Sequence, residues 1–203
     1  MSKYIWLLDP GHGGMINGAY QTRGKRSPAF TDGSILYEGV FNRDIATRIK
    51  TLCDVEGIEC EDIVNSEHDV PLATRVSRAN TRHAGDKRCI YLSIHANAFG
   101  DGMTFNSAHG ICVFYYMTSK MGKEMALKLQ NHLVAKTGMS DRGIVANMEW
   151  ANFYVLKKTQ MPAILSENGF MTNLEDATNL IKDDFRQKVA DAHFEFIKEM
   201  ESS

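Results

Sequence analysis

Short apolar runs alternate with longer amphipathic stretches along the whole of this 203-residue chain. The run at residues 89–94 (CIYLSI) is short and apolar, as expected of a buried strand. Residues 38–56 instead carry apolar side chains at helical spacing. Strands that alternate with helices of about a dozen residues are typical of an α/β domain with a largely parallel sheet. The expected strands are residues 4–9, 58–64, 89–94, 111–116, 153–156 and 163–165, and the expected helices are residues 38–56, 71–84, 119–136 and the segment from 173 onward.

Nothing in the sequence divides the chain into parts. It contains no internal repeat, linker or low-complexity tract, and 43% hydrophobic with 24% charged residues is ordinary globular composition. We therefore expect one domain over residues 1–203, built on a mixed, mostly parallel sheet of about six strands flanked by helices. Residues 10–37 are rich in Gly, Ser, Thr and Asn and are expected to form a long surface loop.

Charge and hydropathy argue against two classes of partner. A formal net charge of -2 argues against a nucleic-acid partner, which usually demands a basic face. No segment approaches the ~20 apolar residues that span a bilayer, so we expect no membrane insertion. The apolar run at residues 4–8 is too short for a signal peptide, and we expect either synthesis without a leader or a leader already removed.

The four cysteines do not form a CxxC pair. Cys89 and Cys112 lie in apolar strand-like runs and are expected to be small buried side chains. A disulfide between Cys53 and Cys60, across the end of the first long helix, is the less favoured alternative.

Polar side chains gather where apolar strands end. Residues 9–14 (DPGHGG) follow the first strand, His95 follows the strand at 89–94, and residues 166–170 (SENGF) follow the last one. Ligands of open α/β sheets bind beyond the carboxyl ends of the strands, so these segments are expected to converge. Glu38, at the start of the first long helix, can add a second carboxylate to the group.

Two histidines with one carboxylate are a known ligand set for catalytic zinc, and a further carboxylate can then move protons. Plainer interpretations remain open. A histidine after a strand is often only a hydrogen-bonded loop residue, and Glu38 can be a first-turn acid favoured by the helix dipole. A phosphate-binding turn is disfavoured, because residues 9–14 lack both the GxGxxG spacing and the GK[ST] of a P-loop.

Four segments, in this order, resemble the signature segments of the zinc-dependent N-acetylmuramoyl-L-alanine amidases of the type-3 family. They are residues 9–14, Glu38, residues 93–97 (SIHAN) and residues 167–170 (ENGF). Residues 72–80 and residues 141–156 resemble two further family segments, so the resemblance covers about residues 4–180. Members of this family are peptidoglycan amidases of bacterial cell division, sporulation and phage lysis.

The resemblance implies a role for each position. His12, Glu38 and His95 would hold one zinc ion and Glu167 would be the catalytic carboxylate, for hydrolysis of the amide bond between N-acetylmuramic acid and L-alanine. Asn97 would contact the stem peptide or, equally well, order its own loop. We further expect a monomer that acts on peptidoglycan in the cell wall or periplasm, and no separate cell-wall-binding domain is visible in the sequence.

Some positions depart from the family pattern or have another expected role. The loop between His12 and Glu38 is longer than is typical, Asn168 stands where Ser or Thr is common, and Ser166 replaces an aliphatic residue. Arg75 and Arg142 are expected to be structural, Arg75 through an ion pair that anchors its helix to the sheet.

Three rival functions remain. A zinc peptidase that cuts within the stem peptide is the nearest, although zinc carboxypeptidases take a His and a Glu from one HxxE turn and His12 is followed by Gly13, Gly14 and Met15. A peptidoglycan-binding module would have lost a ligand or the catalytic Glu. An autoinhibited enzyme would need an occluding helix, within residues 15–37 or 100–110, and neither segment is strongly apolar.

Overall fold

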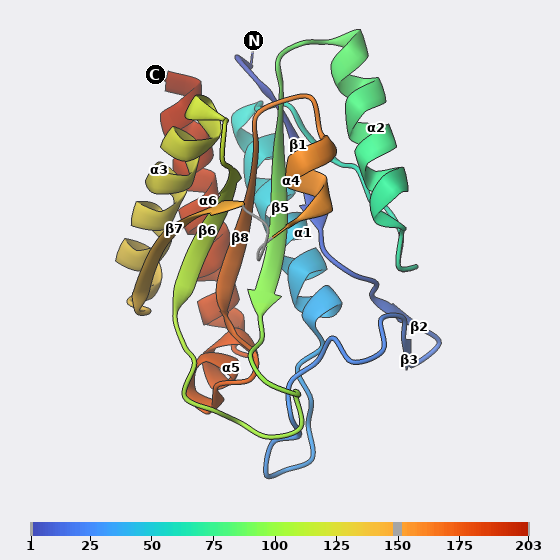
Figure 1. Cartoon of the computed structure of the whole chain (residues 1–203), viewed down its shortest axis with the longest axis vertical. Coiled ribbons are helices and arrows are strands. Elements are labelled where there is room, and N and C mark those ends of the chain that lie inside the picture. The colour runs from blue at the N-terminus through green and yellow to red at the C-terminus, as the bar shows by residue number, and fades with distance from the viewer. Residues whose placement is uncertain (1, 148–151, 203) are drawn as a thin grey trace.

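Six strands form one sheet in the order β4-β1-β5-β8-β6-β7, with helices on both of its faces (Figure 1). This computed structural model describes residues 2–147 and 152–202. The strands are β1 (Ile5–Pro10), β4 (Cys60–Asp62), β5 (Cys89–Asn97), β6 (Ile111–Tyr116), β7 (Asp141–Asn147) and β8 (Ala163–Phe170), and β2 (Met15–Ile16) pairs with β3 (Ala19–Tyr20) in a separate hairpin. The helices are α1 (Glu38–Glu56), α2 (Leu72–Gly85), α3 (Lys120–Thr137), α4 (Tyr154–Lys158), α5 (Leu174–Leu180) and α6 (Asp183–Ser202).

Four neighbouring strands run in the same direction. β4, β1, β5 and β8 are parallel, whereas β6 is antiparallel to β8, and β7 is parallel to β6. The predicted single α/β domain with a mixed, mostly parallel sheet of about six strands is thus confirmed. The consequence for function is that the carboxyl ends of β1, β5 and β8 lie at one edge of the sheet.

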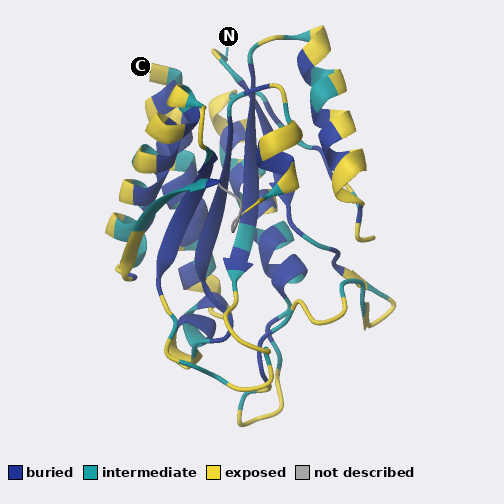
Figure 2. Cartoon of the chain, viewed as in Figure 1, coloured by how far each residue is buried: buried dark blue, intermediate teal, exposed yellow. Residues whose placement is uncertain are grey.

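Side-chain alternation along the strands divides the core in two. The central strands and the helix surfaces that face them are buried (Figure 2). Trp6 and Leu8 of β1 point to the face covered by α1, α3 and α6, while Ile5 and Leu7 point to the face covered by α2 and α4. Both faces are buried, which is why the central strands read as nearly continuous apolar runs. On the larger face, Trp6 packs edge to face against Phe196 of α6 with ring centroids 5.5 Å apart.

The helix that carries Glu38 begins and ends where the sequence predicts. Gly57 has φ 69°, and its left-handed conformation ends α1 because residues with a Cβ rarely adopt it. Pro71 directly precedes α2, and Ser119 caps α3 by accepting a hydrogen bond from the Gly122 amide. The segment from residue 173 onward is helical as predicted, in two pieces, α5 and α6.

The prediction for residues 153–156 is wrong. Tyr154–Lys158 form the short helix α4, and Val155 and Leu156 pack on the smaller core face. The β-propensity of this segment is overridden because a single helical turn buries both side chains against the sheet. The sixth strand is instead β7, an edge strand with mostly half-buried residues and few apolar ones.

Two other features concern compartment and membrane. All four cysteines are free and buried, so the Cys53–Cys60 disulfide is absent from this structure. Within residues 2–147 and 152–202, none of the helices combines the length and the apolar character needed to cross a lipid bilayer.

Candidate metal centre and active-site cleft

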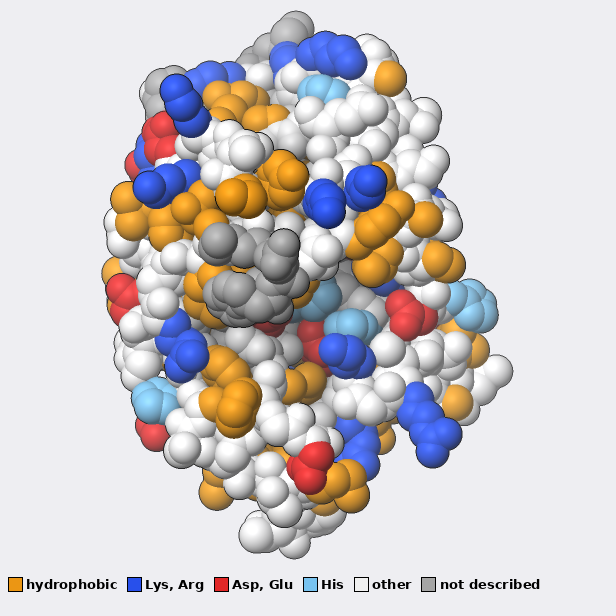
Figure 3. Space-filling view, in the orientation of Figure 1, with side chains coloured by type: hydrophobic (Ala, Val, Ile, Leu, Met, Phe, Trp, Pro, Cys, Tyr) orange, Lys and Arg blue, Asp and Glu red, His pale blue; other side chains and the backbone are white. Residues whose placement is uncertain are grey.

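The three central strands each end in a polar side chain on the same face of the sheet. Alternation along β1 puts Asp9 on the face of Ile5 and Leu7, and the same rule puts His95 and Glu167 on that face in β5 and β8. At the carboxyl end of the strands this face carries a cleft of about 380 Å³, whose surface shows acidic, basic and histidine side chains together (Figure 3). The cleft is lined by all five predicted site residues, His12, Glu38, His95, Asn97 and Glu167.

Glu38 lies between the two predicted histidine ligands. Its Oε2 is 3.2 Å from His12 Nε2 and its Oε1 is 2.9 Å from His95 Nδ1. Among the described residues, these three side chains offer donor atoms that all lie within 4.8 Å of one another. An N, N, O donor set on three side chains leaves room for water or substrate and matches catalytic zinc sites, so the residues fit the ion that the sequence implies.

The electrostatics of the centre favour a negative carboxylate beside two imidazoles. Glu38 is 2% exposed. Burial alone would raise its pKa, but hydrogen bonds from His12 and His95 hold that pKa well below its usual range. Burial would conversely lower the pKa of His95, and the hydrogen bond to Glu38 raises it instead. The Glu38 carboxylate therefore stays ionised, the state in which it can bind a cation.

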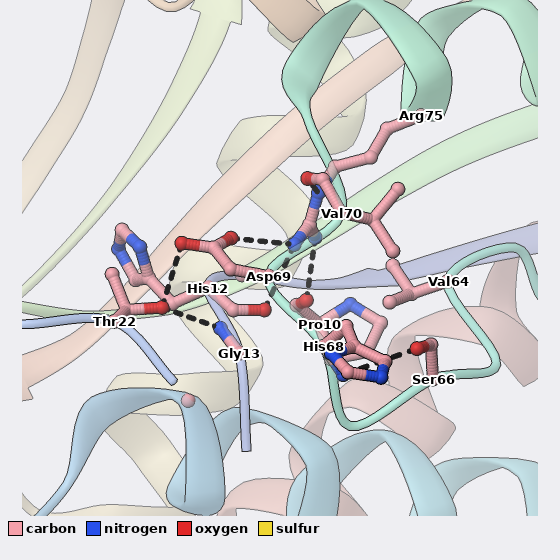
Figure 4. A network of polar contacts seen from close by, with 12 residues as sticks. Pro10, His12, Gly13, Thr22, Val64, Ser66, His68, Asp69, Val70 and Arg75 are labelled. Carbon is pink, nitrogen blue, oxygen red and sulfur yellow. Dashed lines mark hydrogen bonds and ion pairs between the residues drawn. The ribbon is translucent and has the colours of Figure 1, made fainter. Parts of the chain in front are cut away.

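His12 is held in an unusual backbone conformation by two arginines. Its φ is 64°, in the left-handed region, which costs free energy for a residue with a side chain and is found at functional sites. Its carbonyl oxygen accepts hydrogen bonds of 2.8 Å from Nη2 of both Arg43 and Arg75. Figure 4 shows Arg75 reaching from α2 to the turn that carries His12.

Arg75 connects its helix to the sheet, as predicted. It forms a buried ion pair with Asp9, with Nη1 and Oδ1 2.6 Å apart, and donates to the carbonyls of Pro10 and Val70. Arg43 of α1 was not predicted. It donates to the Ser66 and Gly39 carbonyls as well as to His12, so one guanidinium ties three segments together.

Gly11 in the DPGHGG turn and Gly39 in α1 allow the backbone to pack closely at the site. A Cβ at Gly11 would lie 2.1 Å from Cε1 of His95, and a Cβ at Gly39 would lie 1.9 Å from the Gly13 carbonyl oxygen. Any side chain at these positions would displace the turn or the His95 ring. The turn therefore brings His12 against His95, whose rings meet edge to face at 5.1 Å.

Glu167 faces His95 from the neighbouring strand. The two residues are paired across β5 and β8, and Glu167 is 6% exposed. Its Oε2 has no hydrogen-bond partner among the described residues. Burial raises the pKa of Glu167 to about 8, with a further rise from Glu38 and opposing effects of His95 and Lys25. A buried carboxyl with an unpartnered oxygen beside a candidate metal centre is suited to proton transfer.

The remaining predicted residues have varied surroundings. Asn97 accepts a hydrogen bond from the Ala98 amide, which favours its loop-ordering role, and its contact with the stem peptide stays a prediction. Arg142 donates to the His109 carbonyl and lies over the Phe170 ring, consistent with a structural role. Lys25, which was not predicted, lines the cleft and is exposed.

The long loop before Glu38 is anchored at the base of α1. Tyr20 accepts a hydrogen bond from the Gly39 amide and packs against Tyr37, and the Lys25 carbonyl accepts from the Glu38 amide. Neither residues 15–37 nor residues 100–110 contain a helix. The structure thus has no occluding helix in either segment that was considered for autoinhibition.

Comparison with known proteins decides the family. The model of the N-acetylmuramoyl-L-alanine amidase family matches residues 7–199. The chain belongs to this amidase family. It is 32% identical over 190 residues to the N-acetylmuramoyl-L-alanine amidase LytC of Bacillus subtilis, which covers 92% of the chain but 33% of LytC. It is 29% identical over 205 residues to the endolysin of Bacillus phage SPP1, covering 98% of the chain and 66% of the endolysin.

A solved amidase structure has the same fold. The N-acetylmuramoyl-L-alanine amidase from Clostridium difficile 630 superposes with a TM-score of 0.81 at 28% identity, covering 100% of this chain and 99% of that one. The chain spans about a third of the length of LytC.

Proposed function

We propose that this chain hydrolyses the amide bond between N-acetylmuramic acid and L-alanine in peptidoglycan, with one zinc ion held by His12, Glu38 and His95. The observation that carries the proposal is the convergence of these donors within 4.8 Å, with Glu167 facing His95 from the next strand. Membership of the amidase family supports the bond that is cut. The site of action would be the bacterial cell wall, for a domain that works as a monomer.

Zinc bound at these side chains would lower the pKa of water towards neutrality and polarise the scissile carbonyl. Glu167 accepts the proton of the attacking water and delivers it to the alanine nitrogen as the C–N bond breaks. Burial raises the pKa of Glu167, which makes its carboxylate a stronger proton acceptor than an exposed one. The amide nitrogen therefore leaves as an amine, and the muramic acid keeps the new carboxylate.

The cleft has one exposed cation suited to an acidic peptide. Lys25 and Arg75 are the basic side chains of its described lining, and Arg75 is buried in its ion pair with Asp9. The stem peptide of peptidoglycan carries free carboxylates, which the Lys25 ammonium attracts. We propose that Lys25 contacts the peptide, and that Asn97, two residues after His95 in β5, contacts it through its amide group.

The proposal is tested with purified protein, a zinc measurement and a peptidoglycan digest. Wild type should hold about one zinc and release muramic-acid-free stem peptides with a new L-alanine amino terminus. Glu167→Gln should keep zinc and lose activity by at least ~10²-fold, whereas His12→Ala, Glu38→Ala and His95→Ala should lose zinc. Exposed His109, outside the described cleft lining, provides the control His109→Ala, which should match wild type.

The same digest separates the rival functions. A zinc peptidase would release amino termini from within the stem peptide and leave the junction with muramic acid intact. A binding module would retain peptidoglycan without releasing any peptide. Equal product from Glu167→Gln and wild type would refute the catalytic assignment.

A further inference from the structure

A chain of buried hydrogen bonds runs behind Glu167, on the opposite face of the sheet. Ser166 Oγ is 2.9 Å from Nε2 of His193 on α6, and Asn168 Nδ2 donates to Ser166 Oγ at 3.1 Å and to the His95 carbonyl at 2.9 Å. All three side chains are completely buried. We call His193, Ser166 and Asn168 the α6 chain. Two of its members are the positions where the sequence departs from the family pattern.

The donors and acceptors of the α6 chain have only one consistent direction. His193 Nδ1 lies 2.8 Å from the Val189 carbonyl, which accepts only, so Nδ1 carries the proton. Burial lowers the pKa of His193 to about 4, so the ring is neutral and Nε2 is an acceptor for the Ser166 hydroxyl. Ser166 Oγ then accepts from Asn168, whose second amide hydrogen goes to the His95 carbonyl. Rotating the Asn168 amide would place two acceptors in contact, which fixes its orientation as well.

The α6 chain ends at an irregularity in the sheet. His95 pairs with Glu167 and Asn97 pairs with Phe170, so β8 has one more residue than β5 over this stretch. The bulge directly follows Glu167 and includes Gly169, whose φ of 116° excludes most side chains. The Asn168 side chain donates to the His95 carbonyl beside this bulge, so a side chain as well as the backbone connects β5 and β8 where their register shifts. The ladder resumes at the bond from the Met171 amide to the Asn97 carbonyl.

We propose that His193 is a positioning residue, which through Ser166 and Asn168 holds the bulge that aims Glu167 at the candidate metal centre. The backbone of His95 and the backbone of Glu167 are then fixed relative to each other by a side chain on a distant helix. The inference rests on the proposed function, because it concerns how the proposed ligand and the proposed catalytic carboxylate are kept in register.

Variants that break or keep the α6 chain test its role. His193→Leu and Ser166→Ala break it, whereas His193→Gln keeps an acceptor near the position of Nε2. Gln130→Met is the matched control. Gln130 lies on α3, is 1% exposed and donates a hydrogen bond to the Ile111 carbonyl, and it is outside the described cleft lining. The measurements are kcat and KM on peptidoglycan fragments, zinc affinity by chelator competition, and hydrogen exchange of the Met171 amide.

Breaking the α6 chain should lower kcat and zinc affinity about 10–100-fold, the usual effect of losing a partner behind a metal site, with KM changed less than about threefold. Hydrogen exchange at the Met171 amide should become faster when the α6 chain is broken. His193→Gln should keep most of the wild-type kcat. The double variant His193→Leu/Ser166→Ala should lose no more kcat than either single variant. Gln130→Met should leave kcat, zinc affinity and Met171 exchange unchanged at 25 °C.

The proposal is overturned if His193→Leu matches Gln130→Met in kcat and in Met171 exchange, or if His193→Leu and Ser166→Ala have additive effects. Failure of the proposed function has a different signature, since wild type would then bind no zinc or release no product. In that event the rate of hydrogen exchange at the Met171 amide is still compared between His193→Leu and Gln130→Met. Faster exchange in His193→Leu alone would still show that His193 holds the bulge.

Discussion

Arg75 and Asp9 form an ion pair with both side chains 1% exposed. Burial alone would raise the pKa of Asp9, but the Arg75 guanidinium and the Tyr91 hydroxyl hold it below the ordinary value, so the carboxyl stays charged inside the protein. Arg75→Met leaves that charge without its partner, and we expect a loss of about 3–5 kcal/mol in the free energy of unfolding. Urea titration of the variant measures this loss.

Arg82 on the same helix provides the control. Its ion pair with Glu61 is solvent-exposed, with side chains 33% and 43% accessible, so Arg82→Met should cost less than about 1 kcal/mol. If Arg75→Met and Arg82→Met lower the free energy of unfolding equally, the buried ion pair does not stabilise the fold more than the exposed one.

Arg43 holds the His12 carbonyl from the side opposite to Arg75's helix. Arg43→Met should weaken zinc binding about 10–100-fold, because the strained backbone of His12 loses one of its two restraints. Arg43→Lys should fail to rescue binding, since a single ammonium cannot reach the three carbonyls that the guanidinium connects. Zinc competition titrations measure both, and Lys50→Met, on the exposed side of the same helix, should bind zinc like wild type.

Lys25 is expected to act on substrate binding rather than on the chemical step. Lys25→Met should raise KM for acidic stem peptides several-fold, and the salt dependence of kcat/KM should become weaker as one attractive charge is lost. Steady-state kinetics at two ionic strengths measure this. Arg23→Met, exposed two residues away in the same loop and outside the described cleft lining, should leave KM unchanged.

His193 makes stability depend on pH between about 4 and 6.5. Its pKa is about 4 in the folded protein against an ordinary value of 6.5, so the unfolded chain binds its proton first as the pH falls. The contribution is fully present above pH 6.5 and is lost on acidification through this window, amounting to about 3 kcal/mol at 1.36 kcal/mol per pKa unit. Unfolding free energies at several pH values should therefore fall less steeply in His193→Leu than in wild type. Parallel curves for the two proteins would contradict the prediction.

Removal of metal should affect both activity and stability. A chelator should abolish hydrolysis, and zinc should restore it. Because the ligand set exists only in the folded chain, zinc at a thousand times its Kd would add about 4 kcal/mol to stability. The melting temperature of wild type should drop on chelation, while His12→Ala should melt at one temperature with or without the chelator.

Much of this fold was predictable because its local signals agree with one another. The boundaries of α1 follow from helical periodicity and Gly57, and β1, β5 and β6 follow from short apolar runs. The strand predicted at residues 153–156 was wrong because an aromatic and aliphatic tetrapeptide fits a strand and a buried helical turn equally well. β7 was missed because an edge strand that pairs only with β6 needs little apolar character.

The candidate site divides in the same way. His12, His95 and Glu167 stand at or shortly after the ends of apolar runs, so their convergence followed from the topology of a parallel sheet. Arg43 and His193 could not be predicted, because each acts through contacts with residues distant in sequence. Ser166 and Asn168 gave a signal, as departures from the family pattern, but their role depends on contacts with the helix packed behind them.

The segment before Glu38 is closed at its base. The amide of Ser27 donates to the Leu36 carbonyl, and the Leu36 amide donates to Ser27 Oγ, while Arg26 bridges to Tyr37. Residues 28–35 therefore form a loop whose two ends are hydrogen-bonded to each other through Ser27 and Leu36. Doubling the length of such a loop raises the entropic free energy of loop closure by only about 0.6 kcal/mol. Insertion or exchange within residues 28–35 should therefore leave the Glu38 carboxylate in place.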